Sequence, residues 1–443
     1  MKSSSIDTVL EVRLRHEPGT LARVAAAIAQ HGGLLCEIET LRIGDEHTLR
    51  AITVETNTAQ DVPAMIAAVQ NVDGVTVMST RDRVMDSHRG GKIRITSRLP
   101  LDNIRDLRTI YTPGVAQVVR AIQDDRNVAW SSTWRGANVA IVTDGSRVLG
   151  LGNVGPLAAL PVMEGKAVLY DKLADVSAVP LVLDVANADE LVETVVRVSP
   201  GFGAIHLEDI RSPDCFEVER RLGERLRKPV FHDDQHGTAT AVLAALMNAT
   251  KAVHRPLARA RVGVLGLGAA GSAIAGLVKR FGVDDVLCHD PDPRSATRAL
   301  EIGARMVSFA DLMLAADIVV AVTGRAGLIE PGRIQRDQII LALSNPDPEI
   351  DAKDALAAGA ALASDGRTIN NALAFPGLMR GALESRSRAI NHDMMIEAAR
   401  LIASRTEPGE LVPSPLAREL HDAIAAGVVR HARKTGMAGT AAP

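Results

Sequence analysis

The sequence feature that most constrains the fold is a glycine-rich turn at residues 266–271, Gly-Leu-Gly-Ala-Ala-Gly. A largely apolar run at residues 260–265 precedes it, and a helical pattern rich in Ala, Ile and Leu follows it. A strand, a glycine turn and a helix in this order form the pyrophosphate-binding unit of dinucleotide-binding folds, in which the helix N-terminus presents unpaired N–H groups to the phosphates. Because glycine-rich turns are common, a purely structural turn is the alternative.

The glycines of this turn have separate tasks in such a unit. Gly266 allows the tight turn, Gly268 lets the backbone approach the pyrophosphate, and Gly271 lets the helix pack closely on the strand. An acidic residue ends the next predicted strand, as the unit requires. The predicted cofactor-binding residues are Gly266, Gly268, Ala269, Ala270, Gly271 and Asp290.

The residues after the second strand bear on the choice between NAD and NADP. Asp290 could accept hydrogen bonds from the ribose hydroxyls and would repel a 2′-phosphate, which favours NAD. Arg294 and Arg298 follow closely and could hold that phosphate instead. We therefore predict NAD or NADP, with a slight preference for NAD.

Two short apolar runs, within residues 202–210 and 229–236, each end in a pair of acidic residues. The pairs are Glu208 with Asp209, and Asp233 with Asp234. In open α/β sheets the ligand binds beyond the carboxyl ends of the strands, where these side chains would gather. Their mutual repulsion indicates a hard divalent cation with oxygen ligands, Mg²⁺ or Mn²⁺. The alternative is that the acids only cap the helices that follow.

Strand and helix patterns alternate from residue 92 onward, which predicts parallel sheets with both faces covered and an α/β fold. Predicted strands lie at 139–143, 181–185, 204–207, 230–231, 286–289, 318–322, 339–342 and 360–361. Predicted helices lie at 190–198, 215–226 and 237–253, with a mostly helical stretch at 391–434. We predict a substrate and metal domain at 92–235, a Rossmann-type dinucleotide-binding domain at 236–380, and a C-terminal helical segment at 381–443.

Residues 1–86 read as a separate domain. Strand patterns at 8–15, 34–42, 48–55 and 75–80 alternate with helical patterns at 21–30 and 62–69. The order βαββαβ predicts a ferredoxin-like domain with a four-stranded antiparallel sheet and two helices on one face. The polar, glycine-rich residues 86–91 are the predicted linker.

Composition excludes several classes of function. The chain has 443 residues, a net charge of −3 and 23% charged residues, so it has no basic excess suited to nucleic acid. It has no apolar run of the roughly 20 residues that a membrane span needs, and no signal peptide pattern. Its three cysteines show no disulfide or metal-ligand spacing. We expect a cytoplasmic protein without nucleic acid or membrane partners.

Two further segments carry candidate catalytic side chains. Tyr111 stands beside a turn, where a packed ring with a satisfied hydroxyl is the alternative to catalysis. Lys166 lies in an apolar neighbourhood, where desolvation would lower the lysine pKa toward the range useful for a general base. The alternative for Lys166 is an amine that reaches the surface along its own side chain.

Part of the N-terminal domain resembles an ACT domain. The resemblance rests on Arg-His-Glu-Pro-Gly-Thr-Leu at residues 15–21 and on the helix end at Gly32-Gly33. It implies a small regulatory ligand, often an amino acid, bound at a dimeric interface near the first strand-to-helix turn. A structural or dimerising module without a working ligand site is the alternative.

From residue 92 to the C-terminal helices the chain resembles the malic enzyme family. The matching segments, in order, are Ile-Tyr-Thr-Pro-Gly at 110–114, Thr-Asp-Gly-Ser-Arg-Val-Leu-Gly-Leu-Gly at 143–152, Met-Glu-Gly-Lys at 163–166, Glu-Asp at 208–209, Val-Phe-His-Asp-Asp-Gln-His-Gly-Thr-Ala at 230–239, the glycine turn, Ser-Asn-Pro at 344–346, and Asn-Asn at 370–371 with Phe-Pro-Gly at 375–377. The compact loop at 290–294 lacks a longer segment common in the family, which bears on cofactor preference.

The resemblance implies oxidative decarboxylation of L-malate to pyruvate with reduction of NAD(P)⁺. It implies that Glu208, Asp209 and Asp234 hold Mg²⁺ or Mn²⁺, that Lys166 is the general base with Asp233 beside it, and that Tyr111 protonates the enol. It also implies that Arg147 pairs with a malate carboxylate, that Asn345 contacts substrate and nicotinamide, and that Asn370 or Asn371 contacts substrate. A homodimer or higher homo-oligomer is expected.

Three other functions remain open at this point. A hydroxyacid dehydrogenase with an ACT domain would need no metal. A zinc hydrolase would use His232 and His236, although the residue between them is an aspartate and His232 ends a strand. A non-enzymatic amino-acid sensor would have lost the catalytic set, which is present here.

Overall fold

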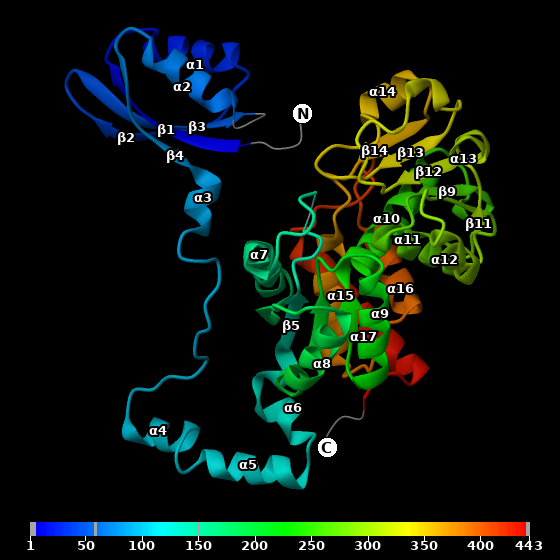
Figure 1. The fold of residues 1–443 in the computed structure, drawn as a ribbon. Helices are drawn as coiled ribbons and strands as arrows, with labels where there is room; N and C mark the ends of the chain where they lie inside the picture. The colour runs from blue at the N-terminus through cyan, green and yellow to red at the C-terminus, as the bar shows by residue number, and fades with distance from the viewer. Residues whose placement is uncertain (1–5, 57–59, 149, 440–443) are drawn as a thin grey trace. The chain divides into compact units, whose positions relative to one another are not determined.

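The structure is a computed structural model and describes residues 6–56, 60–148 and 150–439 (Figure 1). The chain divides into an N-terminal unit, Met1–Lys92, and a C-terminal unit, Ile93–Pro443. Among the described residues no helix has both the length and the apolar character needed to cross a bilayer.

The N-terminal unit has one four-stranded antiparallel sheet in the order β2-β3-β1-β4. Apolar residues alternate along β1 and β3, so that Leu10, Val12, Ile52 and Val54 form one buried face against helices α1 and α2. The elements are β1 (Ile6–Arg15), α1 (Thr20–Gln30), β2 (Leu34–Ile43), β3 (His47–Thr56), α2 (Asp61–Gln70), β4 (Val75–Asp82) and α3 (Arg83–His88).

Helix α3 occupies the first half of the predicted linker, residues 86–88. The carboxylate of Asp82 caps this helix by accepting hydrogen bonds from the N–H groups of Val84 and Met85. Gly90 and Gly91, both at positive φ, follow the helix.

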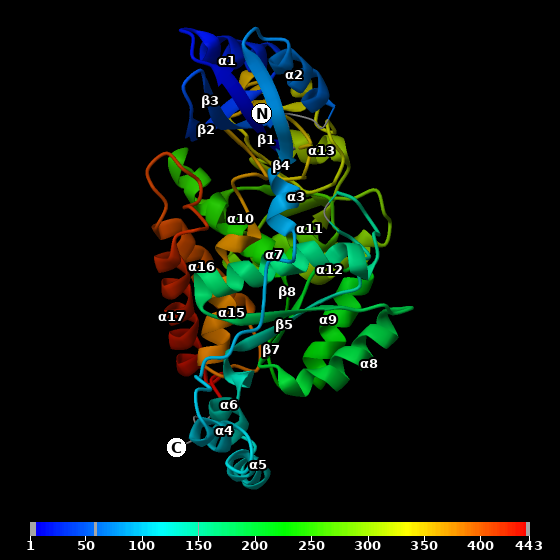
Figure 2. The ribbon, with the colours of Figure 1, turned by 90° about the vertical axis from the view of Figure 1, so that its left-hand side faces the viewer.

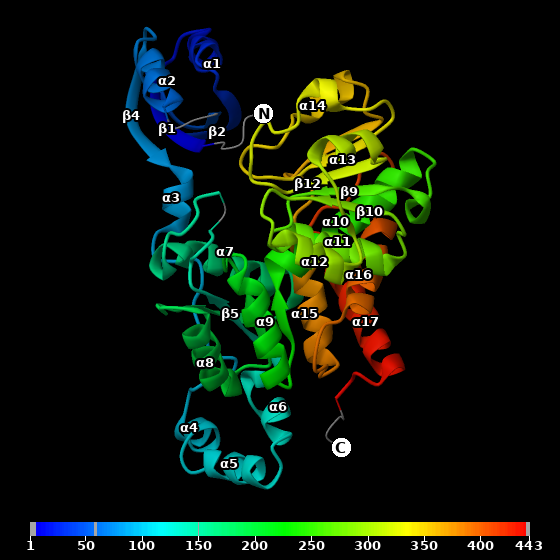
Figure 3. The ribbon, with the colours of Figure 1, turned by 45° about the vertical axis from the view of Figure 1, so that its right-hand side comes forward.

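The first sheet of the C-terminal unit has four parallel strands in the order β6-β5-β7-β8. Alternate residues of β5 face opposite sides: Ala140 and Val142 pack with residues of α8 and α9, and Val139 and Ile141 pack with residues of α7. Figure 3 shows these helices around β5. The elements are β5 (Asn138–Thr143), α7 (Pro156–Ala174), β6 (Ser177–Val182), α8 (Ala188–Val198), β7 (Ala204–Leu207), α9 (Asp214–Arg225) and β8 (Val230–His232).

Strand β6 begins at Ser177, four residues before the predicted start at residue 181. Pro180 lies inside it, and its missing N–H argues against a strand in the sequence. The sheet order makes β6 an edge strand, where one side needs no hydrogen-bonding partner, so proline is tolerated.

The second sheet has six parallel strands in the order β11-β10-β9-β12-β13-β14, a Rossmann-type arrangement. The strands are β9 (Val262–Leu265), β10 (Val286–His289), β11 (Arg305–Met306), β12 (Ile318–Ala321), β13 (Ile339–Ala342) and β14 (Leu362–Asp365). The helices are α10 (Asp233–Ala252), α11 (Ala269–Phe281), α12 (Ser295–Ile302), α13 (Phe309–Ala315) and α14 (Ala352–Ala357). Strand β14 begins just after the predicted strand at 360–361 ends.

Helix α10 begins at Asp233 rather than at the predicted residue 237. Asp233 and Asp234 therefore lie in its first turn, where the helix dipole favours negative charge. This start places both carboxylates directly after strand β8.

Three C-terminal helices pack against α10 and α7 and join the two sheets into one core (Figure 2). They are α15 (Phe375–Glu384), α16 (His392–Ser404) and α17 (Arg418–Thr435). Helices α15 and α17 approach closely, since a Cβ at Gly381 would lie 2.6 Å from the Cβ of Val428. Short 3₁₀ turns are η1 (Trp134–Ala137), η2 (Ser199–Gly201), η3 (Leu257–Arg259), η4 (Pro331–Arg333) and η5 (Asn371–Leu373).

Helices α4 (Ile104–Ile110) and α5 (Val115–Asp124) extend away from the rest of the C-terminal unit (Figures 1 to 3). We call residues 104–124 the α4–α5 arm. Neither helix buries a residue, and α6 (Val128–Ser132) leads back to the unit. The arm exposes apolar side chains: Ile104, Leu107, Ile110, Val115, Val118 and Val119.

Candidate active site

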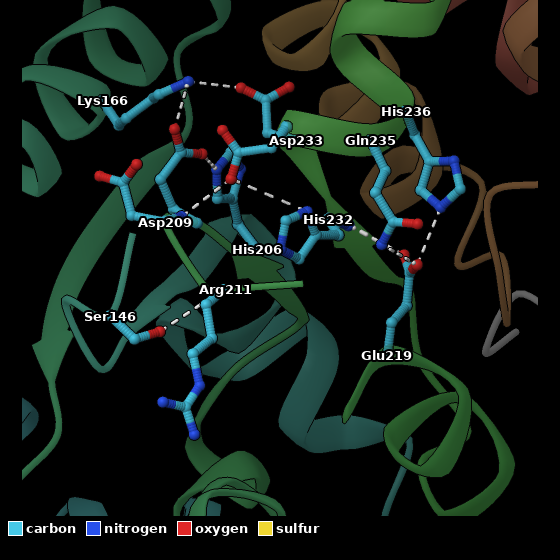
Figure 4. Close-up of polar contacts among 12 residues, drawn as sticks. Ser146, Lys166, His206, Asp209, Arg211, Glu219, His232, Asp233, Gln235 and His236 are labelled. Carbon is cyan, nitrogen blue, oxygen red and sulfur yellow. Dashed lines mark hydrogen bonds and ion pairs between the residues drawn. The ribbon is translucent and has the colours of Figure 1, made fainter. Parts of the chain in front are cut away.

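The four acidic residues meet because β7 and β8 are adjacent parallel strands, with Leu207 opposite His232. Glu208 and Asp209 follow the end of β7, and Asp233 and Asp234 follow the end of β8. Figure 4 shows Asp209 and Asp233 of this group near Lys166.

Three of these carboxylates form a group that can hold a metal ion. One oxygen each from Glu208, Asp209 and Asp234 lies within 4.8 Å of the others. The Oδ2 atom of Asp234 accepts the N–H of Asp209 at 2.9 Å, which joins the two strand ends. Glu208 and Asp209 are buried, and the all-oxygen donor set fits a hard divalent cation such as Mg²⁺ or Mn²⁺.

Lys166, from helix α7, is 8% exposed and points at this group. Its Nζ contacts Oδ2 of Asp233 and lies 3.0 Å from Oε1 of Glu208, and it stands 4.7 Å from the ring centre of Phe375. Desolvation lowers the pKa of Lys166, but the charges of Asp233 and Glu208 outweigh desolvation and the pKa is raised. The predicted lowering is therefore wrong, because the carboxylates arrive from strands remote in sequence.

Burial acts in the opposite way on the carboxyl partners of Lys166. Desolvation raises the pKa of Glu208 to about 8, and the charge of Lys166 only partly offsets this. Desolvation likewise raises the pKa of Asp233 to about 6, against the charge of Lys166. The Oδ1 atom of Asp233 faces Gly237, where a Cβ would lie only 1.8 Å away, so a side chain at this position would displace the carboxylate.

His206 and Tyr170 belong to this site although the sequence prediction omitted them. Nε2 of His206 lies 2.7 Å from Oε2 of Glu208, and Nδ1 lies 2.8 Å from the hydroxyl of Tyr170. Both rings are fully buried, and desolvation lowers the pKa of His206 to about 4. The spacing of His206 and Glu208, two residues apart at a strand end, was an available signal that they share a face.

His232 and His236 do not form a zinc site. Among the described residues, neither belongs to a group of three possible metal ligands. Nε2 of His236 lies 2.9 Å from Oε2 of Glu219, which also accepts from the side-chain amide of Gln235. The backbone N–H of His232 donates to the other oxygen of Glu219, so the first turn of α10 is anchored to α9.

The loop that carries Arg147 lies between the two sheets. The N–H of Arg147 donates to the carbonyl of Asp209 at 3.0 Å, and its guanidinium has no ion-pair partner among the described residues. A Cβ at Gly324, after β12, would lie 3.8 Å from Nη2 of Arg147. A Cβ at Gly150 would lie 3.3 Å from the carbonyl of Asn345. Arg147 and Asn345 therefore approach the same edge of the site.

Asn345 follows β13. The buried carboxylate of Glu349, which the sequence prediction omitted, anchors the loops around it. Glu349 is 0% exposed and accepts hydrogen bonds from the N–H and hydroxyl of Thr323 and from those of Ser344. It thereby ties the end of β12 to the end of β13. The amide nitrogen of Asn345 lies 3.0 Å from the position of a Cβ at Gly366.

The two neighbouring asparagines differ in position. The Oδ1 atom of Asn370 caps η5 by accepting the N–H of Ala372 at 2.8 Å. Asn371 is half-buried, and its Cβ lies 3.2 Å from the position of a Cβ at Gly237, next to Asp233. Asn371 is thus the one placed beside the buried acids.

The glycine turn has the shape that a pyrophosphate requires. Gly266 has φ 88°, which favours glycine, and a Cβ at Gly271 would lie 1.7 Å from the carbonyl of Gly266. Nothing lies within 4 Å of a Cβ at Gly268, which leaves open space at the start of α11, where Ala269 and Ala270 form the first turn. Backbone N–H groups at this helix start can receive phosphate.

The groups predicted to set cofactor preference are engaged within the protein. Asp290 accepts the N–H of Leu267 at 2.6 Å and that of Asp292 at 2.8 Å. Arg294 pairs with Asp292, and Arg298 donates to the carbonyl of Leu267. The geometry favours neither NAD nor NADP.

Tyr111, which the resemblance places in the reaction beside Lys166, lies elsewhere in this chain. It follows α4 in the α4–α5 arm and is 65% exposed. Nothing in the arm buries its ring.

The fold and the site together define a dinucleotide-dependent oxidoreductase. A family model described as the malic enzyme N-terminal domain matches residues 91–223, and one for the NAD binding domain of D-isomer specific 2-hydroxyacid dehydrogenases matches residues 231–326. The NAD-dependent malic enzyme 1 of Bacillus subtilis (strain 168) is 47% identical over 422 residues, which cover 95% of this chain and 96% of that protein. The chain belongs to the malic enzyme family.

Other relatives agree. The NAD-dependent malic enzyme of Geobacillus stearothermophilus is 38% identical over 97% of this chain and 95% of its own length. The crystal structure of a malic enzyme from Pyrococcus horikoshii has a TM-score of 0.75 and 36% identity, covering 80% of this chain and 89% of that chain. The NADP-dependent malic enzyme of Escherichia coli (strain K12) is 35% identical over 79% of this chain and 51% of its own length.

Proposed function

We propose that the protein oxidises L-malate and releases pyruvate and CO₂, with reduction of NAD(P)⁺ and dependence on Mg²⁺ or Mn²⁺. The observation that carries the proposal is the contact of buried Lys166 with Asp233 and Glu208, next to the oxygen cluster of Glu208, Asp209 and Asp234. The printed names of the relatives support malate as substrate and a nicotinamide cofactor.

Glu208, Asp209 and Asp234 would hold the divalent cation, which when bound supplies Lewis-acid stabilisation of negative charge on the C2 oxygen. Lys166 would take the proton of the C2 hydroxyl while the C2 hydride passes to the nicotinamide. Glu208 contacts Lys166 and also belongs to the group that would hold the cation, so the proposed base lies directly beside the proposed metal ligands.

The guanidinium of Arg147 has no ion-pair partner among the described residues, and it would pair with a malate carboxylate. Asn345, held at the edge of the Rossmann sheet, would contact substrate and nicotinamide. Asn371 is favoured over Asn370 for substrate contact, because the side-chain oxygen of Asn370 already caps a turn. The backbone at Gly266 to Gly271 would bind the pyrophosphate.

Loss of CO₂ from the oxidised substrate leaves an enol, and a general acid must protonate C3 to give pyruvate. Tyr111 is the predicted acid, but it lies exposed in the arm. We propose that the arm binds a second copy of the chain, so that Tyr111 of each chain acts beside Lys166 of the other. The exposed apolar side chains of α4 and α5 support such an interface.

The N-terminal unit would be an ACT-like regulatory domain with a ferredoxin-like fold, residues 1–86, that binds a small ligand. Its antiparallel sheet with the order β2-β3-β1-β4 supports this assignment. The remaining boundaries, 92–235, 236–380 and 381–443, the cytoplasmic location and the preference for NAD stay predictions.

One assay tests the proposal: purified protein with L-malate, Mn²⁺ and either NAD⁺ or NADP⁺, with reduced cofactor and pyruvate measured together. We expect both products in equal amounts, and loss of both after chelation with EDTA. Reduced cofactor without pyruvate, or activity that survives full metal removal, would instead indicate a metal-independent hydroxyacid dehydrogenase.

A further inference from the structure

A buried row of polar groups runs from the core to the cation group. The hydroxyl of Tyr170 lies 2.8 Å from Nδ1 of His206, and Nε2 of His206 lies 2.7 Å from Oε2 of Glu208. Tyr170 comes from α7, His206 from β7, and Glu208 from the residue directly after β7. Figure 4 shows His206 beneath the acidic side chains and Lys166. Neither Tyr170 nor His206 has a role in the proposed chemistry.

The protons in this row can be assigned from hydrogen-bond chemistry alone. A carboxylate that holds a cation can only accept, so Nε2 of His206 must donate to Glu208. In a neutral imidazole the other nitrogen is then an acceptor, so the Tyr170 hydroxyl must donate to Nδ1. Tyr170 therefore selects the tautomer of His206 that serves Glu208.

This row fixes the orientation of the Glu208 carboxylate. His206 binds Oε2, and Oε1 lies 3.0 Å from Nζ of Lys166. With one partner on each oxygen, the carboxyl group cannot rotate without breaking a contact. Glutamate is a flexible side chain, and holding it in place before the cation arrives removes an ordering cost from binding.

The surrounding packing supports a shared task. The rings of Tyr170 and His206 both stand edge-on to Phe375, with ring centres 4.8 Å and 5.4 Å away. Nζ of Lys166 lies over the Phe375 ring, 4.7 Å from its centre. Among the described residues, the side chain of His206 has no hydrogen-bond partners other than Tyr170 and Glu208. If Tyr170 and His206 only filled space in the core, the hydrogen bond from His206 to Glu208 would not be required.

We propose that Tyr170 and His206 are positioning residues that orient Glu208 for cation binding, Tyr170 acting through His206. The inference rests on the proposed function, since it assumes that Glu208 is a ligand. Under this proposal, two buried residues that are not metal ligands themselves contribute to the affinity of the site for the cation.

The test measures Mn²⁺ binding directly, from the electron paramagnetic resonance signal of free Mn²⁺ during titration of the protein without substrate. Tyr170→Phe removes one hydroxyl and keeps the ring, and we expect the Mn²⁺ dissociation constant to rise about 10-fold, at the low end for partners of a metal ligand. Thr250→Val is the matched control, because it removes a buried hydroxyl at the far end of α10, bonded to the carbonyl of Leu246. The control should leave Mn²⁺ affinity unchanged.

A double-mutant cycle separates positioning from packing. If Tyr170 acts through His206, Tyr170→Phe has no further effect on Mn²⁺ affinity in the His206→Met background. An unchanged dissociation constant in Tyr170→Phe, or an equal loss in both backgrounds, overturns the inference. Thermal unfolding of each variant reports whether it folds.

A second pair of variants tests the N–H donor itself. His206→Gln and His206→Met have similar size, but only glutamine offers an N–H near the place of Nε2. We expect tighter Mn²⁺ binding in His206→Gln, and equal affinities overturn the inference. If the wild type binds no Mn²⁺ and forms no pyruvate, the proposed function itself fails; normal pyruvate formation with unaffected variants removes only this inference.

Discussion

The Lys166 centre and the α4–α5 arm contrast in burial. Lys166 is 8% exposed and contacts carboxylates from two strand ends, whereas Tyr111 is 65% exposed in an arm that buries none of its helical residues. The proposed base thus has its carboxylate partners within one chain, whereas the proposed acid is exposed in the arm. A motif can predict the chemical role of a residue without showing whether the residue acts in its own chain or in a second copy.

This contrast has a physical cause. The parallel strand ends bring the carboxylates to Lys166 inside the fold, where the buried charges have partners of opposite sign. The arm leaves its apolar side chains exposed, and under the proposed function a second copy of the chain covers them.

The largest effect is expected at the buried centre. Lys166→Ala removes the base and the charge that faces Asp233 and Glu208, and should lower kcat about 10³-fold. Steady-state pyruvate formation measures this. Lys172→Ala, on the same helix with an exposed side chain, is the control and should match the wild type. Near-normal turnover in Lys166→Ala would show that the centre is structural.

Removal of the arm's acid should have the next largest effect. Tyr111→Phe keeps the ring and loses the proton donor, so kcat should fall about 10²-fold while Mn²⁺ affinity stays at the wild-type value. Rate and metal titration are measured on the same preparation. An unaltered kcat would show that Tyr111 is not the general acid.

A charge on the arm should separate the chains. Val119 is 51% exposed on α5, and Val119→Glu would bury an unpaired carboxylate at the proposed interface. We expect the dissociation constant of the dimer to rise about 10²-fold by sedimentation analysis, since a buried unpaired charge costs several kcal/mol. Leu300→Glu, at an exposed position of α12, is the control. Equal association of the two variants would contradict an interface at the arm.

The smallest predicted effect is a pH dependence confined to the buried centre. Burial raises the pKa of Glu208 to about 8, so below that pH the metal-free site must release a proton before Glu208 can bind a cation. Mn²⁺ affinity should therefore rise about 10-fold per pH unit up to about pH 8 and level off above it. Calorimetric titration at several pH values measures it. Tyr111→Phe should show the same profile, and a flat profile would contradict the assignment.

Local signals predicted much of this site. The glycine turn, the acidic strand ends and the Lys166 segment each carry their information within a few residues, and the structure places the acids and Lys166 together. Strand β6 was placed too late because Pro180 looks like a strand breaker until the edge position of β6 is known.

Several effects of distant residues on charge, hydrogen bonding and exposure were not predicted. The pKa of Lys166 rises because Asp233, 67 positions away, reaches it, and the apolar neighbours in sequence gave no sign of this. Tyr170 contacts His206 across 36 positions, and Glu349 ties Thr323 to Ser344 through a fold that only the assembled sheet defines. The exposure of Tyr111 is likewise a property of the arm, not of its motif.

Subunit complementation tests the comparison most directly. Lys166→Ala and Tyr111→Phe chains, each nearly inactive alone, are unfolded together, refolded as a mixture, and assayed for pyruvate. If Tyr111 acts in the partner's site, each mixed dimer has one intact site, and random pairing should restore about a quarter of wild-type activity. If both residues act within one chain, no mixed dimer has an intact site, and activity no higher than that of the separate variants would contradict the account.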